Sequence, residues 1–201
     1  MEIRPFPQDA EALERFAREG PFLWLWEYPD VACVLGAATP VSDVDLDRCA
    51  ADGVPVYRRR GGGGAVVLSP GNLIITACYE ARQKFFPTHW IGSIARAVAL
   101  ALQRVGIAGA AVRGLGDVAV GDRKVLGSSL YVTRQVALYQ GSLLVDPDLE
   151  LIPRYLPHPS REPDYRAGRS HRDFVTSLAR EGYRGGMEAL RAALEAELRA
   201  V

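Results

Sequence analysis

Residues 58–64 join three arginines to four consecutive glycines. Glycine lets backbone N–H groups approach a ligand closely, because it has no β-carbon and adopts positive φ without a steric penalty. Arginine binds phosphate and carboxylate groups bidentately and stays protonated. The combination favours an anion-binding loop. Taken alone, it is equally typical of a flexible loop whose arginines are solvated.

The residues after the glycines limit what kind of loop this is. Neither a Gly-Lys-Ser/Thr sequence nor a G-x-G-x-x-G opening a helix is present here, so the two common phosphate-binding motifs do not apply. Residues 65–68 are Ala-Val-Val-Leu, an apolar run rich in β-branched residues. The loop is therefore expected between two strands, with Arg58 at the strand surface.

Lysine is scarce in this chain. Of the 24 basic residues, all except Lys84 and Lys124 are arginine. Lysine differs from arginine in presenting a compact charge with three rotatable donors on a slim stem. Lys84 is interpreted as an incidental surface residue. Lys124, just past the tight turn predicted at Gly121-Asp122, is the better candidate for chemistry.

Composition limits the class of protein. The 201 residues are 48% hydrophobic and carry a formal net charge of +0, which favours one domain without a broad basic field for nucleic acid or membrane. The N-terminus lacks the apolar region of a signal peptide, so a cytoplasmic location is expected. Cys33, Cys49 and Cys78 are too scattered for a disulfide framework or zinc site and are expected to be free thiols, at least two of them buried.

The hydrophobic pattern predicts strands interspersed with helices, hence an α+β fold in the broad α/β class, with a mixed, largely antiparallel sheet and packed helices. The strands at 22–27 and 31–36 are expected to pair as a hairpin, and Ser42 to cap the second helix. The loop at 157–169 has a length typical of functional loops. Helices are predicted at 7–19, 42–52, 88–105, 149–156, 172–180 and 187–200, and further strands at 54–58, 65–68, 73–79, 117–120, 125–132 and 136–145.

Two motifs in sequence resemble the lipoate-protein ligase A family. One is Arg-Arg-Gly-Gly-Gly-Gly-Ala-Val at 59–66, followed by Gly71-Asn72, and the other is Gly-Asp-Arg-Lys-Val-Leu-Gly-Ser-Ser at 121–129. The resemblance covers most of the chain. It implies a single ligase-like catalytic domain over residues 1–201, with the fold shared by biotin ligases and octanoyltransferases, and without a C-terminal accessory domain. A separate accessory chain is then a candidate partner.

The resemblance also implies a reaction. ATP, accompanied by Mg²⁺, would activate lipoate or octanoate, and the acyl group would pass to a lysine of a lipoyl acceptor domain of a 2-oxoacid dehydrogenase complex or of the glycine cleavage H protein. No nucleic acid, membrane or protein-bound metal is implied. Lys124 would be catalytic. The residues implied in binding the acyl-adenylate are Arg59, Arg60, Gly62, Gly63, Gly64, Ala65, Asp117, Gly127 and Ser128.

Some residues depart from the family pattern and leave alternatives open. The family usually has His, Asn and His where this chain has Leu68, Gly116 and Gln140. These positions leave the acyl group undetermined and allow a non-catalytic lipoyl-binding relative. An octanoyltransferase that takes its acyl group from an acyl-carrier-protein thioester would need a reactive cysteine, for which Cys78 is the only candidate. His171 is interpreted either as a residue closing over a nucleotide or as an ordinary surface histidine.

Overall fold

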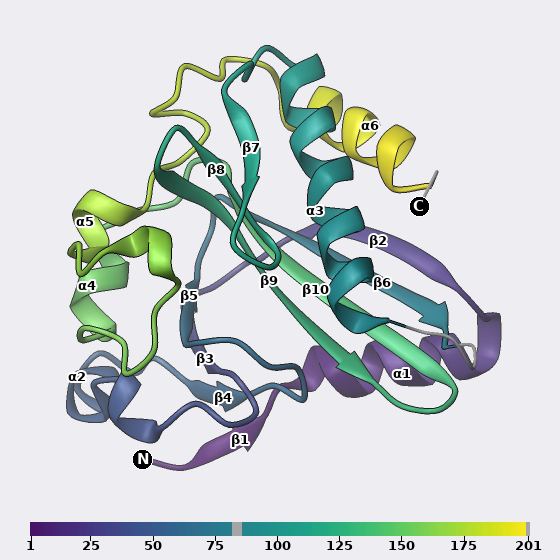
Figure 1. The fold of residues 1–201 in the computed structure, drawn as a ribbon. Helices are drawn as coiled ribbons and strands as arrows, with labels where there is room; N and C mark the ends of the chain where they lie inside the picture. Colours follow the sequence, from purple (N-terminus) through teal and green to yellow (C-terminus); the bar gives the residue numbers. More distant parts are fainter. Residues whose placement is uncertain (82–85, 200–201) are drawn as a thin grey trace.

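A computed structural model describes residues 1–81 and 86–199 of the chain, which form two β-sheets with helices packed around them (Figure 1). The larger sheet is antiparallel throughout. In spatial order its strands are β2 (Phe22–Glu27), β6 (Asn72–Glu80), β10 (Val136–Leu144), β9 (Arg123–Val132), β8 (Asp117–Val120) and β7 (Ala110–Arg113).

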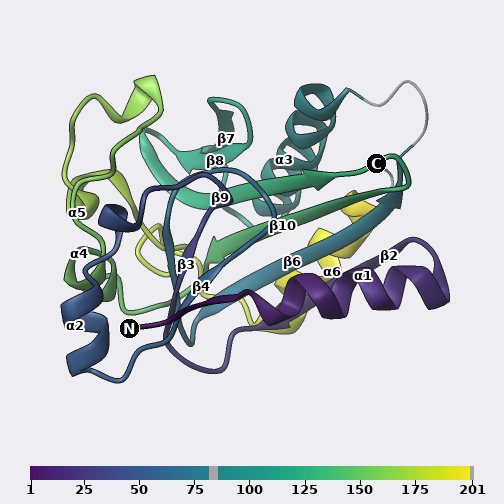
Figure 2. The ribbon, with the colours of Figure 1, turned by 90° about the horizontal axis from the view of Figure 1, so that it is seen from below.

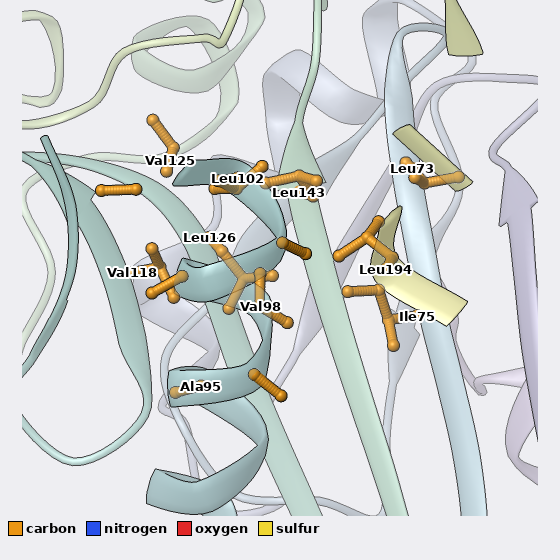
Figure 3. Packing of buried hydrophobic residues seen from close by; sticks show 14 of the residues in the cluster. Leu73, Ile75, Ala95, Val98, Leu102, Val118, Val125, Leu126, Leu143 and Leu194 are labelled. Carbon is orange, nitrogen blue, oxygen red and sulfur yellow. The ribbon is translucent and has the colours of Figure 1, made fainter. Parts of the chain in front are cut away.

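Helices cover both faces of the larger sheet. On β6, Leu73, Ile75 and Ala77 join the main core beneath α3 (Pro87–Arg104) and α6 (Met187–Leu198), as Figure 3 shows for the first two. Cys78 belongs instead to the cluster under α1 (Pro7–Glu19). Successive strand residues point to opposite faces, so the sheet lies between α3 and α1, as Figure 2 shows.

The smaller sheet is mixed and has a core of its own. Leu35, Val56 and Val67 pack there with Tyr155 and Leu156. In spatial order its strands are β1 (Ile3–Pro5), β4 (Val56–Arg58), β3 (Ala32–Leu35) and β5 (Val66–Leu68). The elements near this end of the molecule are η1 (Val41–Asp43), α2 (Leu46–Ala51), α4 (Leu151–Tyr155), η2 (Asp164–Arg166) and α5 (His171–Phe174) (Figure 1).

The predicted fold class is confirmed, whereas the predicted hairpin is wrong. β2 pairs with β6 of the larger sheet, and β3 lies between β4 and β5 of the smaller one. All four residues of β3 are buried, which suits a central strand with a partner on each side. The chain thus crosses from one sheet to the other at residues 28–31.

Two local predictions also need correction, and the strands β1 and β7 were missed. The second helix begins at Leu46 and is capped by the Asp45 side chain, which accepts a hydrogen bond from Arg48 N, whereas Ser42 lies in η1. The helix expected at 172–180 ends at Phe174. β7 was not predicted, since its four residues follow Gly109 directly and carry little periodic signal. Lys84 lies outside the described residues.

No helix within residues 1–81 and 86–199 has the length and apolar character needed to cross a bilayer.

Candidate active site

The glycine loop connects β4 to β5 and is fixed from inside by Arg59. This side chain is only 7% exposed. Its Nη2 donates to the carbonyl oxygens of Gly62 (2.7 Å) and Gly64 (2.9 Å), and its Nη1 to that of Val34 (3.3 Å). Burial lowers the pKa of Arg59 to about 10, so it remains a cation at neutral pH. Arg59 therefore shapes the loop, and its direct contact with an anion stays a prediction.

A second set of contacts holds the loop against residues 36–39. Gly63 has a φ of 92°, and its carbonyl oxygen accepts a hydrogen bond from Thr39 Oγ1 (2.7 Å). A β-carbon on Gly36 would overlap that same oxygen. Arg58 Nη1 donates to the carbonyl oxygens of Gly36 (2.8 Å) and Thr39 (2.9 Å). The sequence suggested that Arg58 is a surface residue, but its side chain holds residues 36–39 in place.

The loop is also tied to helix α1. Arg60 N donates to Asp9 Oδ2 at 2.6 Å, and Asp9 is only 3% exposed. Burial raises the pKa of the Asp9 carboxyl, although the hydrogen bond from Arg60 opposes that shift. The Arg60 guanidinium lies 5.6 Å from the ring centroid of Tyr131. Arg60 is exposed and remains available to bind an anion there.

The structure brings the two sequence motifs into contact. A β-carbon on Gly61 would lie 2.8 Å from Ser129 Oγ, and one on Gly63 would lie 3.5 Å from Ser128 O. The glycine loop therefore runs along β9, where a larger residue at 61 would not fit. Ser128 Oγ donates to Gly116 O (2.7 Å). A side chain at position 116 would clash with Ser128 Oγ at 2.7 Å, so the departure at Gly116 matches the local packing.

Lys124 lies near the start of β9, where two groups define its position. Its Nζ forms an ion pair with Asp117 Oδ1 at 2.8 Å. Tyr165 OH donates to the other carboxylate oxygen of Asp117 at 2.9 Å. Asp117 therefore orients Lys124. Tyr165 comes from the loop at 157–169, and only the length of that loop pointed to it beforehand.

Lys124 lines a cavity of about 110 Å³ between the glycine loop, β9 and α5. Ala65 and Gly127, two other predicted residues, also line it. The predicted residues that do not line it are Arg59, Arg60, Gly62, Gly63, Gly64, Asp117 and Ser128. The full lining comprises Ala65, Val66, Val67, Lys124, Gly127, Ser142, Leu144, Ile152, Leu156, Arg166, His171, Phe174 and Val175.

His171 belongs to this cavity rather than to the open surface. Its Nε2 lies 3.0 Å from Pro157 O, and since a carbonyl oxygen only accepts, Nε2 carries the proton. Burial lowers the pKa of His171, which favours its neutral form at pH 7. The cavity is therefore lined by two basic residues, Lys124 and Arg166, and a neutral imidazole.

The three cysteines are free and buried, as expected. None of them lines the cavity. Cys33 and Cys49 lie with their sulfur atoms 3.6 Å apart, and Cys78 Sγ is 3.7 Å from Ala12 O. Burial raises the pKa of all three thiols, that of Cys78 to about 12. The environment of each thiol thus disfavours the thiolate that a nucleophile requires.

A larger groove of about 770 Å³ lies at α2, α4 and α5. Its charged residues are largely paired with acids, for example Arg154 with Asp52 and Arg172 with Glu150. Neither Lys124 nor a residue of the glycine loop lines it. We therefore assign the site to the smaller cavity.

Residues 5–199 match the family model described as the lipoyl protein ligase A/B catalytic domain. The chain belongs to this family. A protein of Psychrobacter cryohalolentis named lipoate-protein ligase A is 30% identical over 143 residues, which cover 68% of this chain and 39% of that protein. A protein of Aeropyrum pernix provisionally given the same name is 33% identical over 131 residues, covering 65% and 48% of the two chains. The chain thus matches less than half the length of these relatives.

Solved structures of the lipoyl ligase family have the same fold. A bi-partite lipoate protein ligase from Thermoplasma acidophilum, studied with its E2 lipoyl domain, superposes with a TM-score of 0.80 and 22% identity, over 100% of this chain and 83% of that one. A lipoate-protein ligase A bound with ATP gives 0.79 and 21%, over 100% and 85%. The biotin protein ligase of Aquifex aeolicus, with biotin and ATP, gives 0.53 and 13%, over 71% and 55%. The fold expected from the motifs is confirmed.

Proposed function

We propose that this chain is a lipoate-protein ligase that activates lipoate or octanoate with ATP and transfers the acyl group to a lysine of a lipoyl acceptor domain. The observation that carries the proposal is the placement of Lys124. Its ammonium group is held by Asp117 at 2.8 Å, in a cavity that the end of the glycine loop helps to form. Family membership and the ATP-bound ligase of the same fold support it.

The reaction has two steps, and the same positively charged group stabilises both of them. A carboxylate oxygen of the acid attacks the α-phosphorus of ATP, so that pyrophosphate leaves and an acyl-AMP forms. The acceptor amine then attacks the acyl carbon, AMP leaves, and the amine loses a proton. Both steps build negative charge on oxygen, which a fixed ammonium group such as that of Lys124 stabilises. Because Asp117 already holds Lys124 in place, little reorganisation is needed.

Mg²⁺ is expected to enter with ATP. Within residues 1–81 and 86–199, no three His, Cys, Asp or Glu side chains lie together in a way that could hold a metal ion. Asp117, the acidic residue beside Lys124, already contacts Lys124 and Tyr165. Mg²⁺ commonly keeps several waters and binds through substrate phosphates. We therefore assign most of its ligands to ATP and water.

The proposed partners are a lipoyl acceptor domain and a separate accessory chain. The bi-partite ligase of the same fold, described with its E2 lipoyl domain, supports both. Acceptors of two kinds fit the chemistry, the lipoyl domains of 2-oxoacid dehydrogenase complexes and the glycine cleavage H protein.

The alternative is an octanoyltransferase that uses an acyl-carrier-protein thioester. That reaction passes through an acyl-cysteine and requires an accessible thiolate. All three cysteines are buried and none lines the cavity. The geometry therefore favours the ligase.

The test is to incubate the protein with lipoate or octanoate, ATP, Mg²⁺ and an acceptor lipoyl domain. We expect pyrophosphate release and acylation of the acceptor lysine, detected by mass spectrometry. Matched reactions omit ATP or replace it and the free acid with octanoyl carrier protein. Transfer from the carrier protein without ATP would replace the ligase proposal with the transferase. The same reactions are repeated with an accessory chain added.

A further inference from the structure

Arg166 is a buried cation in the wall of the cavity that also contains Lys124. It is the last residue of η2 and is only 4% exposed. Its Nη2 atom is buried and has no hydrogen-bond partner among the described residues. A buried donor without an acceptor is costly, and more so when it carries charge. Such an atom therefore requires an explanation.

The rest of the Arg166 side chain is well held. Its Nε donates to Arg169 O (2.9 Å) and lies 3.3 Å from Glu162 Oε2. The ring of Phe174, another cavity residue, lies 4.9 Å from the guanidinium carbon. The guanidinium is therefore fixed at Nε while Nη2 remains unused. A ligand with an acceptor oxygen would satisfy it.

The charge of the cavity favours an anionic group. Most of its lining residues are apolar, and among those described Lys124 and Arg166 are the only charged ones, with no acidic residue. Glu162 and Asp117 balance the two cations from outside the lining. The cavity volume of about 110 Å³ is several times the roughly 10–15 Å³ that one water molecule needs by the same measure. The cavity therefore has room for a phosphoryl group.

The position of Arg166 is linked to that of Lys124 through its neighbour Tyr165. Tyr165 OH donates to Asp117, which forms the ion pair with Lys124. Since Tyr165 and Arg166 are adjacent in η2, this turn fixes one residue on the Lys124 ion pair and places the next in the cavity wall. The two cations are thus positioned by one connected set of contacts.

We propose that Arg166 is a second phosphate-binding residue of this site, which donates from Nη2 to a phosphate oxygen of the nucleotide held by Lys124. The inference rests on the proposed function, because it takes the nucleotide as the ligand. It adds a residue outside both sequence motifs. It also gives the 157–169 loop a direct role in binding.

The experiment compares Arg166→Gln and Arg166→Lys with Arg169→Gln as a matched control. Arg169 lies in the same segment and near the same Phe174 ring, but it bonds to Asp122 and to the carbonyl oxygens of Tyr165 and Arg166 and does not line the cavity. Calorimetry measures the Kd of each protein for ATP with Mg²⁺, for pyrophosphate and for lipoate, and thermal unfolding reports folding.

We expect Arg166→Gln to weaken binding of ATP and pyrophosphate by about tenfold or more, the usual effect of losing a hydrogen bond from a charged donor. Arg166→Lys should retain part of the affinity, since it keeps the charge but not the fork. Lipoate binding should change by less than about twofold in either variant. Arg169→Gln should weaken ATP binding by less than about threefold, within the range of an exposed ion pair.

Unchanged affinity for ATP and pyrophosphate in folded Arg166→Gln would overturn the inference. An equal loss of affinity in Arg169→Gln would also overturn it, because Arg166 would then only help to order the loop. If Arg166→Gln does not fold, the inference is tested with Arg166→Lys and with the Nε–H NMR signal of Arg166 in the wild type. That signal should shift on adding pyrophosphate, and its failure to shift would count against the inference. Phosphate binding that depends on Arg166 without any acyl transfer by the wild type would overturn the proposed function alone.

Discussion

The ammonium group of Lys124 lies against Gly127, where a β-carbon would stand 2.9 Å from both Nζ and Cε of the lysine. The two residues are three apart on β9, and both line the cavity. Gly127 therefore provides the space that the Lys124 side chain occupies on its way to Asp117. The glycine of this motif has a steric purpose that the sequence alone did not show.

Gly127→Ala should displace the Lys124 ammonium group without unfolding the protein. The clash involves the far end of a flexible side chain, so the fold should lose only about 1 kcal/mol, a typical value for a single substitution. A displacement of about 1 Å can cost about a hundredfold in rate, and we expect a loss of that order in acyl transfer. Gly186→Ala is the control, since its β-carbon would meet no atom within 4 Å and its φ is −75°. Normal transfer by Gly127→Ala would refute this steric role.

Lys124→Arg should abolish acyl transfer in a folded protein. Arginine keeps the positive charge but replaces a compact ammonium by a wide planar group. The wider group cannot keep the position of the ammonium, which lies between Asp117 and Gly127. Lys84→Arg is expected to be silent and serves as the comparison. Near-normal pyrophosphate release by Lys124→Arg, with an unchanged Tm, would contradict the assignment of Lys124.

Gly63→Val should remove binding of a non-hydrolysable acyl-adenylate analogue. The φ of 92° suits glycine, and a β-carbon would lie 3.0 Å from Arg59 Nη2, the atom that holds the loop. Gly20→Val is the matched control. Gly20 also has a positive φ, 77°, but a β-carbon there would meet no atom within 4 Å, and the residue follows α1, outside the glycine loop.

Both valine variants should lose stability, by about 1–3 kcal/mol for a strained backbone conformation. Only Gly63→Val should lose the analogue, as measured by calorimetry. Equal affinity in the two variants would show that the glycine loop is only a connector.

Asp9→Asn should change how stability depends on pH. Burial raises the pKa of Asp9 above its ordinary value of 3.8, so the folded state binds its proton more tightly than the unfolded state. By linkage, the contribution of Asp9 to stability is greatest below pH 3.8 and is lost as the pH rises through its folded pKa. The free energy of unfolding of the wild type, minus that of Asp9→Asn, should therefore increase as the pH falls from 7 towards 4. Urea unfolding at several pH values measures it, and a difference that is constant or decreases would be the contrary result.

The cysteines should be inert in the folded protein. Burial raises the pKa of Cys78 to about 12, and Cys33 and Cys49 are also buried. A thiol reagent should therefore label them only on unfolding. Replacing all three with Ala or Ser should cost on the order of 1 kcal/mol for each site and leave ATP-dependent transfer intact. An octanoyl adduct on Cys78, found by mass spectrometry after incubation with octanoyl carrier protein, would instead support the transferase.

The sequence by itself determined the elements whose signal is local. The α1 helix occupies residues 7–19 as predicted, because its apolar spacing and the following Gly20 lie within a single segment. Lys124 and the glycine run were singled out because scarcity and residue type are properties of the chain. The two motifs also pointed to the family that the comparisons confirm.

Only the tertiary structure decided which residues meet. The pairing of β2 with β6 depends on long-range contacts, since the apolar pattern of a strand reveals that it is buried but not which strand lies beside it. Likewise, Arg58 and Arg59 looked like free cations, and only the fold turns their guanidinium groups onto backbone carbonyls. Tyr165 reaches Asp117 across 48 residues of sequence, and no local pattern encodes that contact.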